Sequence, residues 1–197
     1  MSSSHSLDRI CVQFDDPRSI SDAGLILPAT LAQHLELAQL VDAHVNLSKA
    51  PGAANAGDKA MTVISSLLAG GDCIDDVSAL RAGKTGAVLG HRVAAPSTVG
   101  TFLRAFRWGH APQLDSVSGK LLVRAWGAGA GPGEGPLTID VDSTICETYG
   151  LKKQGGSRFT YTHVRGYHPL VAVAAKSGDI IHSRLRGGPA NSGRGAD

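Results

Sequence analysis

The spacing of apolar residues changes across the segment GAGAGPGEGP at residues 127–136, and this change constrains the fold most. Before the segment, apolar side chains recur every three to four residues, which is typical of amphipathic helices. After it, Leu137, Ile139 and Val141 alternate with polar residues, as in a strand with one buried face. Alternate glycines make residues 127–136 a flexible linker. The sequence therefore predicts an α+β protein, helical over residues 1–126 and strand-rich over residues 137–197.

Helical spacing predicts helices over residues 27–45, 60–68 and 74–81, with two more that begin near Ser97 and at Pro112. The first is expected to bury a face that includes Leu27, Leu31, Leu35, Ala38, Val41 and Val45. The second is expected to bury Ala60, Val63, Ile64, Leu67 and Leu68. Asp72 is a candidate N-cap for the third helix.

The helices at 74–81 and after Ser97 admit two interpretations. As a helix-turn-helix, they would present Arg104 and Arg107 to DNA. The connection between them is much longer than the three- or four-residue turn of that motif. An ordinary helical bundle is therefore favoured, with Arg104 and Arg107 kept as candidate DNA-binding residues.

Three strands follow the linker. They are expected over residues 137–142, 169–176 and 180–186. The turn Ser177-Gly178-Asp179 joins the last two, which predicts an antiparallel hairpin. Because no helical pattern separates the strands, they are expected to form an antiparallel three-stranded meander.

Charge and cysteine usage narrow the class of protein. The formal net charge is +2, but residues 1–60 hold four basic and seven acidic side chains, so the remainder is basic. A basic remainder is compatible with an anionic partner such as DNA. Three scattered cysteines argue against a disulfide framework and favour a reducing, cytoplasmic location. The chain also lacks an apolar run long enough for a membrane span and a signal-peptide pattern at Met1.

Asp140 and Asp142 are the strongest candidates for catalytic or metal-binding residues. Residues two apart on a strand project to the same face, so the two carboxylates are expected to be neighbours. Paired hard oxygen ligands suit Mg²⁺ or Mn²⁺, which can serve phosphoryl transfer. The alternative is structural, since aspartates also cap the turn that follows a strand.

The next segment interleaves basic and aromatic residues. Residues of this kind in a glycine-containing loop can hold phosphates and stack on bases. The alternative is that the positive charge only balances the nearby aspartates. The candidate DNA-binding residues of this loop are Lys152, Lys153, Arg158, Tyr161, His163 and Arg165.

Two known families match the motif at Asp140 and Asp142. The pattern Asp140-x-Asp142-x-Thr144 resembles the haloacid-dehalogenase-type phosphatases, in which the first aspartate is the nucleophile. That fold is a parallel sheet, whereas an antiparallel hairpin is expected here.

The surrounding sequence resembles the DDE transposases of bacterial insertion sequences, group 1 type. The resemblance runs from about Val12 to the last residue and is most specific from Asp142 to Arg186, in IDVDSTICETYGLKKQGG and in the segment from Tyr161 to Ala196. The upstream segments SSLLAGGDCIDDVSALRAG and APSTVGTFLRAF resemble that family's helical N-terminal region. The resemblance implies the opening meander of a ribonuclease-H-like core. The first acidic residue of the catalytic triad would be Asp142, with Asp140 as the second choice for that role. It also implies Mg²⁺- or Mn²⁺-dependent nicking and strand transfer at transposon ends.

The resemblance has one departure. After Asp142 the acids are Glu147, Asp179 and Asp197, and none matches the family's second aspartate or its glutamate. The chain is therefore interpreted as the N-terminal fragment of a transposase, which would bind metal weakly and lack catalysis on its own. A non-catalytic DNA-binding module is the alternative. In a fragment, the later elements of the core that would bury the hairpin are missing, so its apolar residues would be partly exposed and would favour self-association. These residues are Val171, Val173, Ile180 and Leu185.

Overall fold

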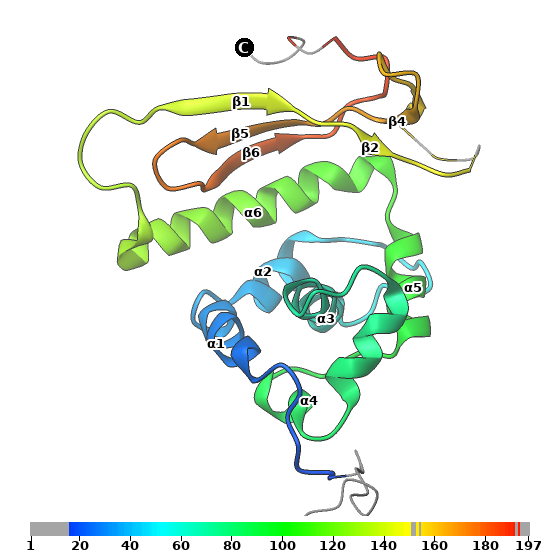
Figure 1. The fold of residues 1–197 in the computed structure, drawn as a ribbon, viewed down its shortest axis with the longest axis vertical. Helices are drawn as coiled ribbons and strands as arrows, with labels where there is room; N and C mark the ends of the chain where they lie inside the picture. Colours follow the sequence, from blue (N-terminus) through cyan, green and yellow to red (C-terminus); the bar gives the residue numbers. More distant parts are fainter. Residues whose placement is uncertain (1–15, 151–152, 154, 192, 194–197) are drawn as a thin grey trace, which may run out of the picture.

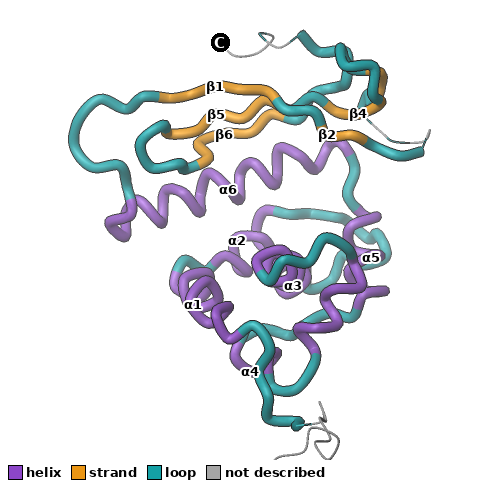
Figure 2. Tube along the Cα trace, viewed as in Figure 1, coloured by secondary structure: helices purple, strands orange, loops and turns teal. Residues whose placement is uncertain are grey.

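The computed structural model describes residues 16–150, 153, 155–191 and 193 of the 197-residue chain. Helices and strands separate into two layers along the chain, and the long helix α6 lies between them (Figures 1 and 2). The helical segments are η2 (Ala23–Leu25), α1 (Ile26–His34), α2 (Leu37–His44), α3 (Ala56–Leu68), η3 (Ile74–Arg81), α4 (Thr85–Val88), α5 (Pro96–Ala105), η4 (Trp108–His110), α6 (Ala111–Ala125) and η5 (Trp126–Ala130). The strands are β1 (Ile139–Ser143), β2 (Cys146–Glu147), β3 (Arg158–Phe159), β4 (Arg165–Tyr167), β5 (Leu170–Ala174) and β6 (Ile180–Arg184). The content confirms the predicted α+β class.

The helical layer is built around one main apolar core. Helices α2, α3, α5 and α6 contribute to it, with Leu40, Val41, Phe102 and Val117 among its buried residues. A smaller cluster joins α1 to η3 and the end of α4. None of the helices in the described part of the chain is long and apolar enough to cross a bilayer.

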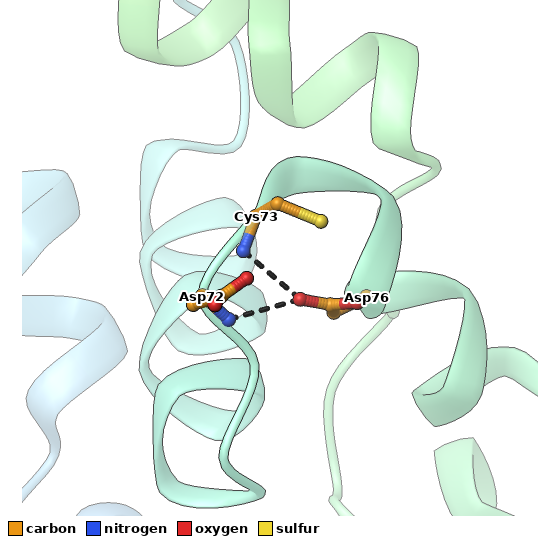
Figure 3. A group of neighbouring side chains, drawn as sticks. All are labelled: Asp72, Cys73 and Asp76. Atoms are coloured by element: carbon orange, nitrogen blue, oxygen red, sulfur yellow. Dashed lines mark hydrogen bonds between the residues drawn. The ribbon is translucent and has the colours of Figure 1, made fainter.

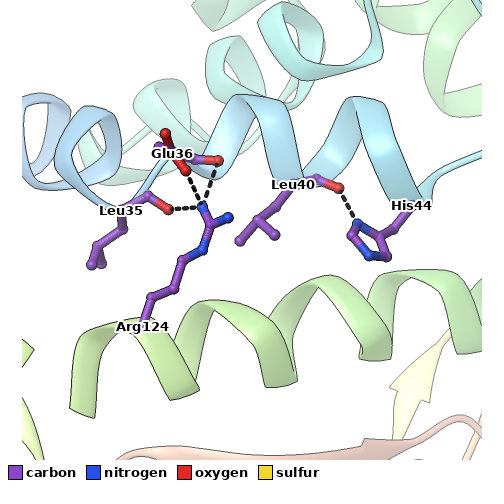
Figure 4. A network of polar contacts seen from close by, with 5 residues as sticks. All are labelled: Leu35, Glu36, Leu40, His44 and Arg124. Atoms are coloured by element: carbon purple, nitrogen blue, oxygen red, sulfur yellow. Dashed lines mark hydrogen bonds and ion pairs between the residues drawn. The ribbon is translucent and has the colours of Figure 1, made fainter. Parts of the chain in front are cut away.

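The helix predicted over residues 27–45 is two helices, α1 and α2. The break falls at Glu36, which adopts a left-handed conformation with φ of 52°. Arg124 of α6 donates a hydrogen bond of 2.7 Å to the Leu35 carbonyl and lies 3.0 Å from the Glu36 carboxylate (Figure 4). The break leaves Leu27 and Leu31 exposed, so their predicted burial was wrong.

Helix α3 buries only part of the face that was predicted. Ala60 and Ile64 are partly buried against the main core, as predicted. Leu67 and Leu68 are exposed, whereas the small polar residues Thr62, Ser65 and Ser66 are buried. The Thr62 hydroxyl donates to the Asp58 carbonyl at 2.9 Å and accepts from the Ala94 amide at 3.1 Å. These hydrogen bonds give the buried Thr62 hydroxyl both a donor and an acceptor partner, so its burial leaves no unpaired polar atom.

The main sheet has the order β1-β5-β6, with antiparallel pairing throughout. Strand β1 pairs with β5 from Ile139↔Ala174 to Ser143↔Leu170, and the hairpin β5–β6 closes the sheet. This confirms the predicted antiparallel pairing of the three strands. Among the described strands, β1 pairs with β5 alone, which leaves its other edge open.

A second, smaller sheet lies between β1 and β5 in the sequence. Its order is β2-β4-β3, again antiparallel, and it continues from the end of the main sheet (Figure 1). The segment was predicted to be a loop, so this sheet corrects the prediction. Its strands are two or three residues long and hold together because β4 pairs with both neighbours.

Helix α6 contacts both layers. It packs against α2 on one side and against β6 on the other (Figure 1). Asp115 of α6 accepts a hydrogen bond of 2.7 Å from the Ser183 hydroxyl of β6. The division of the chain at residues 127–136 stays a prediction.

Candidate functional site

Asp140 and Asp142 lie on the open edge strand β1 of the main sheet. Both side chains are exposed. Their pairing partners on β5 are Val173 and Val171, so the carboxylates project to one common face. The register therefore places the two carboxylates as neighbours, as the sequence pattern requires, in a position that solvent and an ion can reach.

The face that carries Asp142 is the one toward helix α6. Asp142 pairs with Val171, and Val171 pairs with Ser183, whose hydroxyl bonds to Asp115 of α6. Residues directly opposite in an antiparallel sheet share a face. Helix α6 packs on β6, two strands away from β1, so Asp142 remains exposed. One carboxylate oxygen, Oδ1, accepts a hydrogen bond of 2.7 Å from the Ser143 amide.

A buried histidine fixes the end of β1 directly after Asp142. His168 is 1% exposed, and its Nε2 lies 3.0 Å from the Ser143 hydroxyl. Its Nδ1 lies 2.9 Å from the Ala190 carbonyl, and Arg186 Nε donates a hydrogen bond of 2.8 Å to the backbone carbonyl of His168. A histidine with both ring nitrogens engaged is a structural group here, and it anchors the chain at the point where β1 ends and the small sheet begins.

The candidate basic residues divide between two surfaces. Arg158 and Arg165 lie on β3 and β4 of the small sheet, and Tyr161 and His163 lie in the turn between these strands. Arg104 lies in the last turn of α5, with Arg107 just beyond it, and both are exposed. Lys153 is exposed, and Lys152 lies outside the described residues.

The two surfaces meet through Trp108, which sequence reasoning missed. Its ring centroid lies 5.9 Å from that of Tyr167 on β4. Gly155 sits against the same indole, so closely that a side chain there would overlap the ring. The contact joins η4 of the helical layer to the small sheet and places Arg107 beside it. The paired aromatic residues were visible in the sequence, but their contact depends on a fold that brings positions 108 and 167 together.

A second group of acids lies at the start of η3, far along the chain from β1. Asp72, Cys73 and Asp76 have ligand atoms within 4.8 Å of one another (Figure 3). The Asp76 carboxylate accepts hydrogen bonds of 2.9 Å from the amides of Asp72 and Cys73. Its pKa is lowered, first by the Cys73 amide, then by the Cys73 side chain and the Asp72 amide. The N-cap of η3 is therefore Cys73, with Asp76 as the N3 residue of a capping box, and the predicted Asp72 is not the cap.

The acids that follow Asp142 in the described chain have other positions. Asp179 lies in the turn before β6, where it accepts hydrogen bonds from Ser177 Oγ at 2.7 Å and Trp126 Nε1 at 2.9 Å. Ser177, and then Trp126, lower the pKa of this carboxyl. Glu147 lies on β2 and pairs with Gly166. Asp179 joins the end of α6 to the hairpin, which is a structural role.

Comparison with known proteins gives a family. No curated protein and no solved structure matches the chain. The model of the family described as transposase DDE domain group 1 matches residues 3–197, which is nearly the whole sequence. The chain therefore belongs to the transposase DDE domain group 1 family.

Proposed function

We propose that this chain forms the first part of a ribonuclease-H-like transposase core that nicks and transfers DNA strands at transposon ends. The observation that carries the proposal is the pair of exposed carboxylates, Asp140 and Asp142, on the open edge strand of an antiparallel three-stranded sheet. The family is one of transposases, which act on DNA and use divalent metal ions. We assign Asp142 as the first acidic residue of the catalytic triad, with Asp140 beside it.

The two carboxylates fit a divalent cation. Both are exposed, share a face and offer hard oxygen atoms, which Mg²⁺ and Mn²⁺ prefer. One Asp142 oxygen already accepts the Ser143 amide, which orients the carboxylate. A bound Mg²⁺ would supply activation of an attacking water or hydroxyl and stabilisation of the leaving oxygen. The residues of the chain hold the strand end in place: His168 binds Ser143, and Ser143 binds Asp142.

The remaining acidic ligands of the triad are proposed to come from polypeptide outside these residues. Asp179 is engaged by Trp126 and Ser177, and Glu147 lies on β2 of the other sheet, where it pairs with Gly166. One or two carboxylates leave most ligand positions of a divalent cation to water, so binding is expected to be weak. The open edge of β1 is where further strands of such a core would pair.

The haloacid-dehalogenase interpretation requires a parallel sheet. The pairings between the described strands are antiparallel, and β1 leads into β2 rather than into a helix. These features favour the transposase interpretation. A non-catalytic DNA-binding module remains the second proposal, supported by the exposed basic residues Arg104, Arg107 and Arg158.

Calcium-dependent DNA binding tests the proposal. A 30-base-pair duplex of mixed sequence is titrated with the wild-type chain and with Asp142→Asn, with and without Ca²⁺. A cation shared by Asp142 and a DNA phosphate strengthens wild-type binding about three- to tenfold, and the effect is lost in Asp142→Asn. Asp115→Asn, on α6, is the matched control. An equal response to Ca²⁺ in wild type and Asp142→Asn favours the DNA-binding module and contradicts the catalytic assignment.

A further inference from the structure

The small sheet presents an aromatic and basic face that its antiparallel register defines. Phe159 of β3 pairs with Arg165 of β4, so their side chains share a face. Tyr167 lies two residues after Arg165 on the same strand and therefore projects to that face as well. Glu147 of β2 pairs with Gly166 and so projects to the opposite face. The face thus carries one cation between two aromatic rings and keeps the carboxylate of β2 away.

The helical layer extends this face. Trp108 stacks at a tilt of 36° on Tyr167, with 5.9 Å between ring centroids. Arg107 precedes it and is exposed, with its amide held at 2.9 Å by His110 Nδ1. We call the resulting surface the aromatic–basic stripe. Its residues are Arg107, Trp108, Tyr167, Arg165 and Phe159.

The aromatic rings at the outer end of the stripe are open to solvent. Phe159 is 66% exposed and Trp108 is 37% exposed. Tyr161, which follows β3, is 71% exposed. Arg165 Nε is buried and donates to no acceptor among the described residues. Large exposed aromatic residues beside arginines are the combination that stacks on bases and binds phosphates.

One contact ties the stripe to the candidate catalytic strand. His168 follows Tyr167, the last residue of β4, and its Nε2 lies 3.0 Å from the hydroxyl of Ser143, which directly follows Asp142. The strand that carries Arg165 and Tyr167 is therefore joined to the end of β1.

We propose that the aromatic–basic stripe binds unpaired nucleotides of single-stranded DNA, with a base stacked on Phe159 and phosphates bound by Arg107 and Arg165. This inference rests on the proposed action on DNA. Bases inside a duplex are already stacked on each other, so their faces are closed to a side chain, whereas those of a frayed or nicked end are open. The stripe would hold the nucleotides that unpair next to the reacting phosphate.

The test measures the affinity of the same full-chain variants for single-stranded DNA and for duplex DNA. Fluorescein-labelled (dT)20 and a 20-base-pair duplex are titrated by anisotropy. Phe159→Ala and Phe159→Leu are expected to weaken binding of (dT)20 about five- to one-hundredfold, the effect of one base–aromatic stack. Phe159→Trp should keep (dT)20 binding within about threefold, because it keeps an aromatic ring. Duplex binding should change less than about threefold in each variant.

A second measurement follows the indole itself. The chain has two tryptophans, so Trp126→Phe leaves Trp108 as the source of tryptophan fluorescence. Saturation with (dT)20 should quench this fluorescence, and the duplex should not. Leu27→Ala, which removes an exposed apolar side chain on α1, is the control.

The outcomes separate the stripe from the wider function. Equal loss of (dT)20 and duplex affinity in Phe159→Ala, or retention of (dT)20 affinity in Phe159→Leu, overturns base stacking. If either result appears while Ca²⁺-dependent duplex binding still requires Asp142, only the stripe is wrong. If neither DNA binds, the action on DNA is wrong as well.

Discussion

The buried imidazole of His168 lies 3.0 Å from the hydroxyl of Ser143, the residue that directly follows Asp142. The same ring lies 2.9 Å from the Ala190 carbonyl, so one side chain joins the end of β1 to the segment after β6. The carboxylate assigned to the catalytic triad is therefore held by a chain of two hydrogen bonds. These hydrogen bonds fix the end of β1 next to the candidate site, although the outer edge of this strand is open.

Replacing His168 by alanine is expected to destabilise the chain by about 2–4 kcal/mol. The substitution opens a cavity at a fully buried position and leaves the partly buried Ser143 hydroxyl and Ala190 carbonyl without their partner, and an unpaired buried group costs about 1–3 kcal/mol. Urea unfolding, followed by circular dichroism, measures the change. His182→Ala on the exposed side of β6 is the control and should cost less than about 1 kcal/mol. Equal losses in both variants would show that His168 has no special role.

The antiparallel sheet was predictable, and the small sheet was not. Alternating polar and apolar residues specify β1, a short apolar run specifies β5, and the turn that contains Gly178 specifies the hairpin, so these features depend on local sequence. Strands β2, β3 and β4 are too short to carry a pattern. They form because β4 binds a strand on each side, which is information from distant positions.

The helical break at Glu36 was equally hidden. The apolar spacing runs on through Leu35, and no glycine or proline marks the end of α1. The break depends on Arg124, which lies far along the chain and donates to the Leu35 carbonyl. For the candidate site, the sequence predicted Asp140 and Asp142 as neighbours. It placed His168 in the basic and aromatic segment, but neither the burial of His168 nor the contact of Trp108 could be predicted, since both depend on tertiary contacts.

Arg124→Ala is expected to destabilise the helical layer by about 1–2 kcal/mol. The guanidinium caps the Leu35 carbonyl at 2.7 Å, and a hydrogen bond from a charged donor contributes about this much. Glu36→Gln should cost less than about 0.5 kcal/mol, because its ion pair with Arg124 is largely exposed. Thermal or urea unfolding of both variants checks the order. A larger loss in Glu36→Gln would mean that the ion pair, and not the carbonyl cap, fixes the break.

The lowered pKa of Asp76 predicts that the stability of the fold depends on pH. Hydrogen bonds from the Cys73 and Asp72 amides lower the pKa of Asp76 below its ordinary value of 3.8. A carboxyl whose folded pKa is lowered stabilises the fold above its unfolded pKa and loses this contribution as the pH falls through the folded pKa. Asp76→Asn should therefore be less stable than wild type at pH 7, with the difference closing as the pH falls below 3.8 and through the lowered folded pKa. Asp75→Asn is the neighbouring control, and a pH-independent deficit in Asp76→Asn would contradict the charge-based cap.

The open edge of β1 predicts self-association. Ile139 and Val141 are 46% and 44% exposed, and the outer edge has no partner strand among the described ones. Exposed apolar edge strands pair with other chains, and a lysine placed there opposes this. Val141→Lys should shift the chain toward monomer in analytical ultracentrifugation with little change in stability. Val123→Lys, at an exposed position of α6, should leave the association unchanged. A wild-type chain that is monodisperse at high concentration would refute the prediction.

Manganese-induced broadening of backbone amide signals in a ¹⁵N-labelled sample tests the catalytic assignment most directly. The assignment predicts that Mn²⁺ first broadens residues 139–144 and the neighbouring Val171, and that Asp142→Asn removes this effect. Broadening that begins instead around Asp72 and Asp76, and is unchanged in Asp142→Asn, would contradict the assignment of Asp142 as the metal-binding carboxylate.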